Sequence, residues 1–170
     1  MKNRQLQYFR NNVPSAGLAA ILLALLLAAM PAAADSDCRS ITPEVSSMRT
    51  AEMIFTTETE EIRFTGRLAQ SPAQRAAGMQ HLCREAIHDN PMLFVFDTSR
   101  RPGFHMNNVH EALDILFLDE DGHVNEIHRM VPGGDLTFPA HPARYALELL
   151  DGESARLGLA PGMRLRVHPH

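Results

Sequence analysis

The chain has 170 residues, of which 16 are basic and 20 acidic, and its only lysine is Lys2. Three of the basic residues and none of the acidic ones lie in residues 1–34, so residues 35–170 carry 13 basic and 20 acidic side chains, a formal charge of −7. This balance disfavours nucleic acids and anionic membrane surfaces as partners, because binding to either needs a basic face. Without a lysine after position 2, Schiff-base chemistry is excluded from that region.

The first 34 residues have the pattern of a secretory signal peptide. A basic start precedes the apolar run 16–30, and Pro31–Ala34 supplies the small residues that a signal peptidase recognises. An uncleaved anchor is the alternative, but this run falls short of the roughly 20 apolar residues that span a bilayer. We therefore expect cleavage after Ala34, export to the periplasm or the medium, and no stable membrane span afterwards.

The region after the predicted cleavage site has the size of one ordinary domain. Residues 35–51 are polar and lack sustained periodicity, which predicts an extended lead-in, and residues 52–170 are predicted to form a single β-rich domain. Cys38 and Cys83 are the only cysteines. In an oxidising compartment they favour one disulfide. Two independent thiols remain the alternative, since a single pair has no spacing pattern.

The first half of this region predicts a hairpin, a short helix and a central strand. Apolar and polar residues alternate over 61–68, as in a half-buried strand, and 53–57 is its expected hairpin partner. The stretch Ser71–Gln74 has the residues of a capping box with proline at the first helical position, so a helix should follow to about Met79. The apolar run 92–96 suits a strand covered on both faces.

The second half predicts further strands separated by turns. A second apolar run, 113–118, is followed by the turn sequence 119–122 and a strand from Val124. Residues 132–142 form a Gly/Pro-rich loop. The remaining expected elements are a strand over 144–149, a short helix over 152–157 and a strand over 163–167. Strands therefore dominate, and the pattern predicts a mainly β (α+β) fold, a compact barrel-like or strongly curved sheet with one or two short helices.

A polar cluster between the two apolar runs is the best candidate for a ligand site. It comprises His105, Met106, Asn107 and Asn108, and Asp114 follows within the second run. Because burying a carboxylate without a partner costs several kcal/mol, we expect Asp114 to accept hydrogen bonds from backbone amides or from Asn108 and to fix the loop. The alternative is a ligand-facing acid or base.

Methionine and histidine near each other also allow a soft-metal hypothesis. Met79, His81, His105 and Met106 are the candidate ligands, and such side chains suit copper. No established ligand spacing accompanies them, so neither a metal site nor any other cofactor is predicted.

Three stretches of the sequence carry a family resemblance: GRLAQSPAQRAAGMQHL, the segment 91–122, and PARYALELLDGESARLGLAPGMRLRV. Together they resemble the domain of unknown function family 192, in whose members the domain is often preceded by an export signal. The family usually has Trp-Met-Lys-Asn-Thr followed by Pro-Leu-Asp in the middle segment. This chain matches at Met106, Asn108, Leu113 and Asp114, and departs at His105, Asn107, Val109 and Ala112. The resemblance implies a small β-rich fold and no settled activity.

These observations favour an exported, non-catalytic binding or accessory module for a small polar ligand or an envelope partner. The alternative is an enzyme that acts on a small polar or glycan-like substrate through Asp114, with help from His105 or Asn108. A soft-metal (copper) binding protein is the third hypothesis.

Overall fold

The computed structural model describes residues 38–56 and 60–170. The predicted signal peptide, residues 1–34, lies outside this part. Among the described residues, no helix combines the length and the apolar character needed to cross a bilayer.

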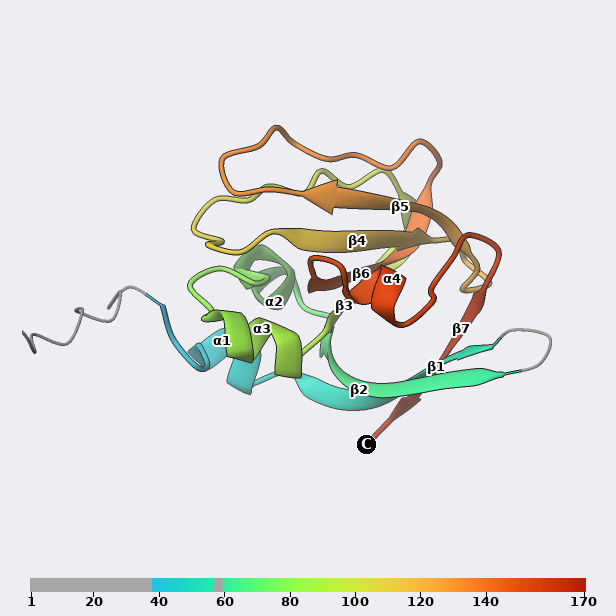
Figure 1. Ribbon diagram of the computed structural model, residues 1–170, viewed down its shortest axis with the longest axis horizontal. Helices are drawn as coiled ribbons and strands as arrows, with labels where there is room; N and C mark the ends of the chain where they lie inside the picture. Colours follow the sequence, from blue (N-terminus) through green and yellow to red (C-terminus); the bar gives the residue numbers. More distant parts are fainter. Residues whose placement is uncertain (1–37, 57–59) are drawn as a thin grey trace, which may run out of the picture. The chain divides into compact units, whose positions relative to one another are not determined.

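The described part of the chain forms one mixed sheet of seven strands (Figure 1). The strands are β1 (Arg49–Thr56), β2 (Glu61–Ala69), β3 (Met92–Arg100), β4 (Leu113–Leu118), β5 (Val124–Met130), β6 (Ala143–Leu150) and β7 (Arg164–Pro169). Their order is β5-β4-β6-β3-β2-β1-β7. The β2–β3 pair is parallel and every other pair in the sheet is antiparallel.

The sheet is open, which corrects the barrel-like or strongly curved sheet expected from the sequence. Its edge strands β5 and β7 form no ladder with each other. They are linked at one end by an isolated bridge between His123, just before β5, and Arg164, and by backbone hydrogen bonds of Val124 with Gly162 and Met163. Closure into a barrel needs a continuous ladder between the two edges. The alternation of apolar and polar residues within each strand carries no information about which strands lie at the edges. The sequence therefore could not distinguish an open sheet from a closed barrel.

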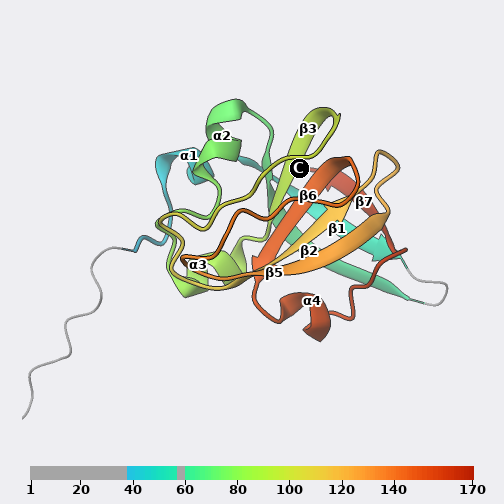
Figure 2. The same ribbon diagram turned by 90° about the horizontal axis from the view of Figure 1, so that it is seen from above.

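Four short helices accompany the described strands, where one or two were expected. They are α1 (Pro43–Ser46), α2 (Pro72–Ala77), α3 (Arg84–Asp89) and α4 (Glu153–Arg156). Figure 2 shows α1, α2 and α3 gathered together and α4 on the other side of the strands. The connection from β2 to the parallel β3 runs through α2 and α3.

Local signals formed as predicted at α2 and at the β4–β5 turn. The hydroxyl of Ser71 accepts the backbone N–H of Gln74 at 3.2 Å, and the side chain of Gln74 accepts the N–H of Ser71 at 3.0 Å. In the turn, Asp119 Oδ1 accepts the N–H of Asp121 at 2.9 Å, and Gly122 adopts φ 84°. Such a positive φ favours glycine.

Both faces of the sheet are covered by apolar side chains. On β4, Leu113 and Ile115 belong to one core cluster and Leu116 to the other, as period-two alternation requires. The first cluster also contains Ile87 of α3, and the second contains Leu159 after α4. Strands β3, β4 and β6 are thus buried between two layers.

The segment expected as an extended lead-in is partly structured. It contains α1, capped by Thr42, and the first residues of β1. Val45 and Met48 are buried in the first core cluster. Cys38 and Cys83 form a disulfide, which confirms the predicted pairing and ties this segment to the start of α3.

Candidate functional site

A cavity of about 260 Å³ opens on the face of the sheet that carries α2. Residues of α2, β3, the β3–β4 loop and β6 line it. Its chemically distinctive lining residues are Arg75, Phe94, Phe96, Arg100, Phe104, His105 and Glu148. We call this cavity the Glu148 pocket.

Glu148 is a buried carboxyl in the middle of the sheet. Strand β6 lies between β3 and β4, and Met92 and Ile115 are the cross-strand neighbours of Glu148. The residue is only 4% exposed, and its carboxyl makes no hydrogen bond or ion pair within the described part of the chain. Every fully enclosed polar side-chain atom of the described residues has a partner, so the Glu148 carboxyl must reach the pocket.

Burial changes the ionisation of this carboxyl. Loss of solvation raises the pKa of Glu148 from its ordinary 4.5 to about 8. The side chain is therefore mostly protonated near neutral pH and can donate a hydrogen bond. A carboxyl whose pKa is strongly shifted and which faces a cavity is a candidate for function.

Two arginines and a phenylalanine form one wall of the pocket. The guanidinium carbons of Arg75 and Arg100 lie 5.6 Å and 5.4 Å from the centre of the Phe96 ring. Both distances allow a cation–π contact. Arg75 also donates to the carbonyls of Gln70 and Val95, whereas Arg100 makes no side-chain hydrogen bond or ion pair with the described residues.

The loop 105–108 borders the pocket through His105, whose side chain lines it. His105 Nδ1 accepts the N–H of Asn107 at 3.3 Å, which leaves Nε2 to carry the proton of a neutral ring. Asn108 adopts φ 57° and donates from its side chain to Gln80 at 3.0 Å. Its carbonyl accepts the N–H of His81 at 2.7 Å. Met106 is buried in the core.

Asp114 does not anchor this loop, and the prediction that it does is wrong. Its Oδ2 accepts the N–H and the hydroxyl of Ser154 at 3.0 Å and 2.6 Å. Alternation along β4 turns Asp114 to the face opposite Leu113 and Ile115, and therefore opposite the pocket. One donor is a backbone N–H, a kind of partner that the prediction included, but it belongs to Ser154 of α4 and not to the loop.

A second hollow lies on the other face of the sheet and has a volume of about 420 Å³. Its lining includes Leu93, Tyr145 and Leu165. None of the buried polar residues of the described chain lines it, so the Glu148 pocket is the better candidate for a ligand site.

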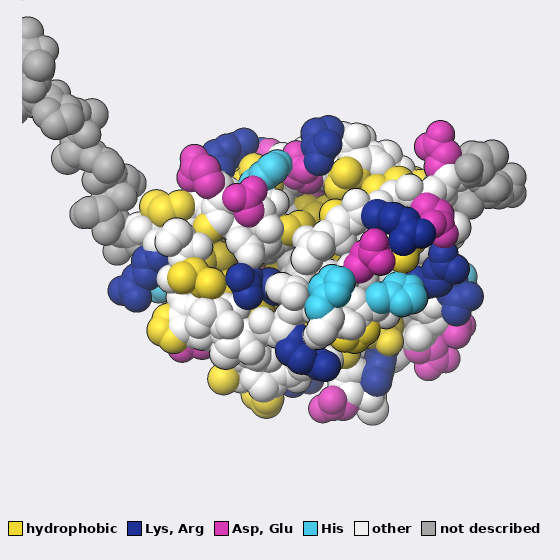
Figure 3. Space-filling model, turned by 90° about the horizontal axis from the view of Figure 1, so that it is seen from below, with side chains coloured by type: hydrophobic (Ala, Val, Ile, Leu, Met, Phe, Trp, Pro, Cys, Tyr) yellow, Lys and Arg dark blue, Asp and Glu magenta, His cyan; other side chains and the backbone are white. Residues whose placement is uncertain are grey.

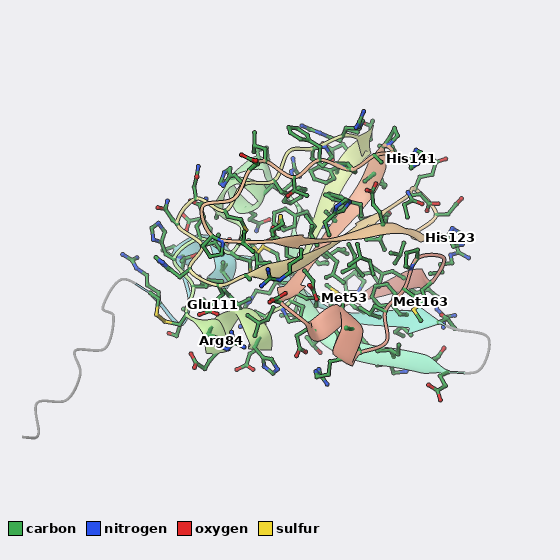
Figure 4. The ribbon with its side chains drawn as sticks, turned by 45° about the horizontal axis from the view of Figure 1, so that its top comes forward. Met53, Arg84, Glu111, His123, His141 and Met163 are labelled. Atoms are coloured by element: carbon green, nitrogen blue, oxygen red, sulfur yellow. A yellow bond between two sulfur atoms is a disulfide. The ribbon has the colours of Figure 1, made fainter. Side chains whose placement is uncertain are left out.

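The residues considered for a soft metal fall into different settings. Met79 is buried in the core, and His81 adopts φ 60° in the α2–α3 connection. In the described part of the chain, three clustered His, Cys, Asp or Glu side chains occur at Asp119, Asp121 and His123, and none of the four candidate residues belongs to this cluster. Figure 4 shows His123 in the turn after β4. Arg84 and Glu111 lie near the opposite end of β4, where their ion pair joins α3 to the loop before β4.

Sequence reasoning missed Glu148, Arg75 and Arg100. The sequence Ala146-Leu147-Glu148-Leu149-Leu150 carried the same signal that drew attention to Asp114, a carboxylate inside an apolar strand. No comparable signal marked the arginines, because the pocket that they share forms only when α2 packs beside β3.

The family model DUF192, described as "Uncharacterized ACR", matches residues 53–167. The chain belongs to this family. The resemblance seen in the sequence is thereby confirmed, and every residue that lines the Glu148 pocket lies inside the matched DUF192 range.

Two solved structures are similar to this DUF192 chain. One, from Sinorhizobium meliloti 1021, is described as a "putative transcription regulator"; it has 33% identity and a TM-score of 0.66, with 71% of this chain and 95% of that chain covered. The other is a protein of unknown function from Novosphingobium aromaticivorans DSM 12444, with 27% identity, a TM-score of 0.65, and 81% and 99% coverage. No curated protein matches.

Proposed function

We propose that this DUF192 protein is an exported, non-catalytic binding module and that the Glu148 pocket holds a small polar ligand. The observation that carries the proposal is the unpartnered carboxyl of Glu148 at the cavity. A polar ligand in the pocket would complete the hydrogen bonding of this carboxyl, which has no partner among the described residues. The mixture of aromatic and polar lining residues is typical of small-molecule sites.

Export is the second part of the proposal. Its support is the signal-peptide pattern of residues 1–34 together with the Cys38–Cys83 disulfide, because disulfides persist in oxidising compartments. If no small ligand binds, the proposed partner of the module is an envelope protein.

The test is a ligand screen read by NMR. Libraries of small acids, amines and sugars are added to the isotope-labelled protein, and hits should shift the amides of the pocket wall. Glu148→Gln should weaken these hits, whereas Glu85→Gln, an exposed carboxyl on α3, should not. If no compound class perturbs the pocket, the small-ligand proposal fails.

An enzyme is the second candidate, and one observation favours it. A carboxyl whose pKa is raised by burial to about 8 can exchange protons near neutral pH, which suits a general acid or base. His105 lines the same cavity. In this enzyme hypothesis the general acid or base is Glu148 and not Asp114, because the hydrogen bonds that Ser154 donates hold Asp114 on the other face of the sheet. Release of product from a bound hit would favour it.

The Sinorhizobium protein is described as a transcription regulator, a class of protein that often binds nucleic acid. In this chain nucleic-acid binding has little support. Residues 35–170 carry a formal charge of −7. On the face in Figure 3, acidic and basic side chains are interspersed and form no basic patch. Phosphate backbones bind to concentrated positive charge.

A further inference from the structure

We infer that the Glu148 pocket selects a small organic anion with an apolar body, such as an aromatic monocarboxylate. This inference rests on the proposed function and names the ligand class of the same site. It is carried by the placement of two guanidinium groups, three aromatic rings and a single carboxyl around one cavity.

The positive charge of the pocket is not neutralised by neighbouring acids. Arg75 and Arg100 line the cavity, and Glu148 is its only acidic lining residue. Neither arginine has an ion pair among the described residues, and Arg100 keeps all its side-chain donors free. A guanidinium presents donors in a planar fork that matches a carboxylate, so Arg100 is the best placed group to hold an anion.

The apolar part of the ligand has aromatic walls to contact. The rings of Phe94 and Phe104 meet edge to face, with centroids 5.0 Å apart and an interplanar angle of 86°. Phe96 adds a third ring, already in contact with the two guanidiniums. Aromatic faces bind other flat rings well, and the volume of about 260 Å³ limits the ligand to a small one.

Glu148 favours an anion over a cation in its protonated form. Its cross-strand neighbours Met92 and Ile115 cannot ionise, and the titratable or charged side chains that share its cavity are Arg75, Arg100 and His105. Protonated, the carboxyl donates a hydrogen bond to an oxygen of the ligand. An organic cation would need the ionised carboxylate and would meet two arginines in the same cavity.

Three probes of almost the same shape test the charge preference: benzoate, benzamide and benzylammonium. Calorimetric titration of the purified protein, slightly below neutral pH, should show that benzoate binds at least about tenfold more tightly than benzamide, with benzylammonium weakest. Arg100→Gln should weaken benzoate by about tenfold and benzamide by less than about twofold. Arg156→Gln, which removes an exposed arginine from α4, should change neither.

The inference is overturned if benzylammonium binds most tightly, or if Arg100→Gln leaves the benzoate affinity unchanged. In both outcomes the proposed function survives if the bound probe still shifts the amides of the pocket wall in the NMR experiment. If none of the three probes binds, the ligand class is wrong. The small-ligand form of the proposed function then falls only if the wider NMR screen also leaves the pocket unperturbed, which separates the two failures.

Discussion

Glu148 should make the stability of the protein depend on pH in an unusual direction. Burial raises its pKa to about 8 in the folded state, whereas the unfolded chain ionises near the ordinary value of 4.5. Between these values the folded state holds a proton that the unfolded state has released. The contribution of Glu148 to stability is therefore fully present below the unfolded pKa and is lost as pH rises through the folded pKa, by on the order of 4–5 kcal/mol in total.

The measurement is the free energy of unfolding by denaturant from about pH 5 to about pH 9, for the wild type and for Glu148→Gln. The side-chain amide that this variant carries at position 148 cannot ionise, so the free energy of unfolding should lose the pH dependence that Glu148 causes. The Glu148→Gln variant should therefore gain stability relative to the wild type as pH rises. Parallel curves for the two proteins would show that Glu148 ionises normally.

Asp114 stabilises α4 instead of the pocket loop. Its carboxylate accepts two hydrogen bonds from Ser154, and hydrogen bonds to a charged group contribute about 1.5–3 kcal/mol. We expect Asp114→Ala to cost on the order of 2–3 kcal/mol, and Ser154→Ala, which removes only the hydroxyl, to cost less. Hydrogen exchange should increase at α4 and stay unchanged over residues 105–108. Faster exchange confined to that loop would contradict the assignment.

At the scale of elements, the disulfide fastens the segment before α1 to the start of α3. Cys38 and Cys83 are 45 residues apart, and closing a loop of that length stabilises a fold by roughly 3–4 kcal/mol in the chain-entropy model. Replacing both cysteines with serine should lower stability by about that amount, measured by denaturant unfolding. Reduction of the wild type should have a similar effect. Two reactive thiols in the unfolded, unreduced protein would disprove the pairing.

Elements that depend on neighbouring residues could be predicted from the sequence, and those that depend on distant ones could not. The cap of α2 by Ser71 needs only Gln74, three residues away. Burial of Glu148 depends on β6 lying between β3 and β4. The strand itself was predicted to within one residue at each end, while the burial of Glu148 was not predicted. Likewise α1 is held by burial of Val45 and Met48, which polar composition alone did not reveal.

At the scale of the molecule, the open sheet explains where the candidate site lies. A closed barrel would offer an interior, but this sheet has two faces, each with its own apolar cluster. Helices α1 to α3 lie together (Figure 2). The pocket is lined by residues of α2, β3, the β3–β4 loop and β6. Period-two alternation then separates the two carboxyls of the central strands, with Glu148 toward the pocket and Asp114 toward α4.

Export should remove residues 1–34 and leave a protein that begins at Asp35. The small residues Ala32 and Ala34 have the spacing that a signal peptidase recognises, and a disulfide such as Cys38–Cys83 is favoured in an oxidising compartment. Intact mass and N-terminal sequencing of the extracytoplasmic fraction measure the outcome. Ala34→Gln should block processing because it places a large residue at the cleavage site, and the matched Ala33→Gln should not, because the intervening position is permissive. Recovery of only a membrane-bound 170-residue form from the wild type would refute the predicted export.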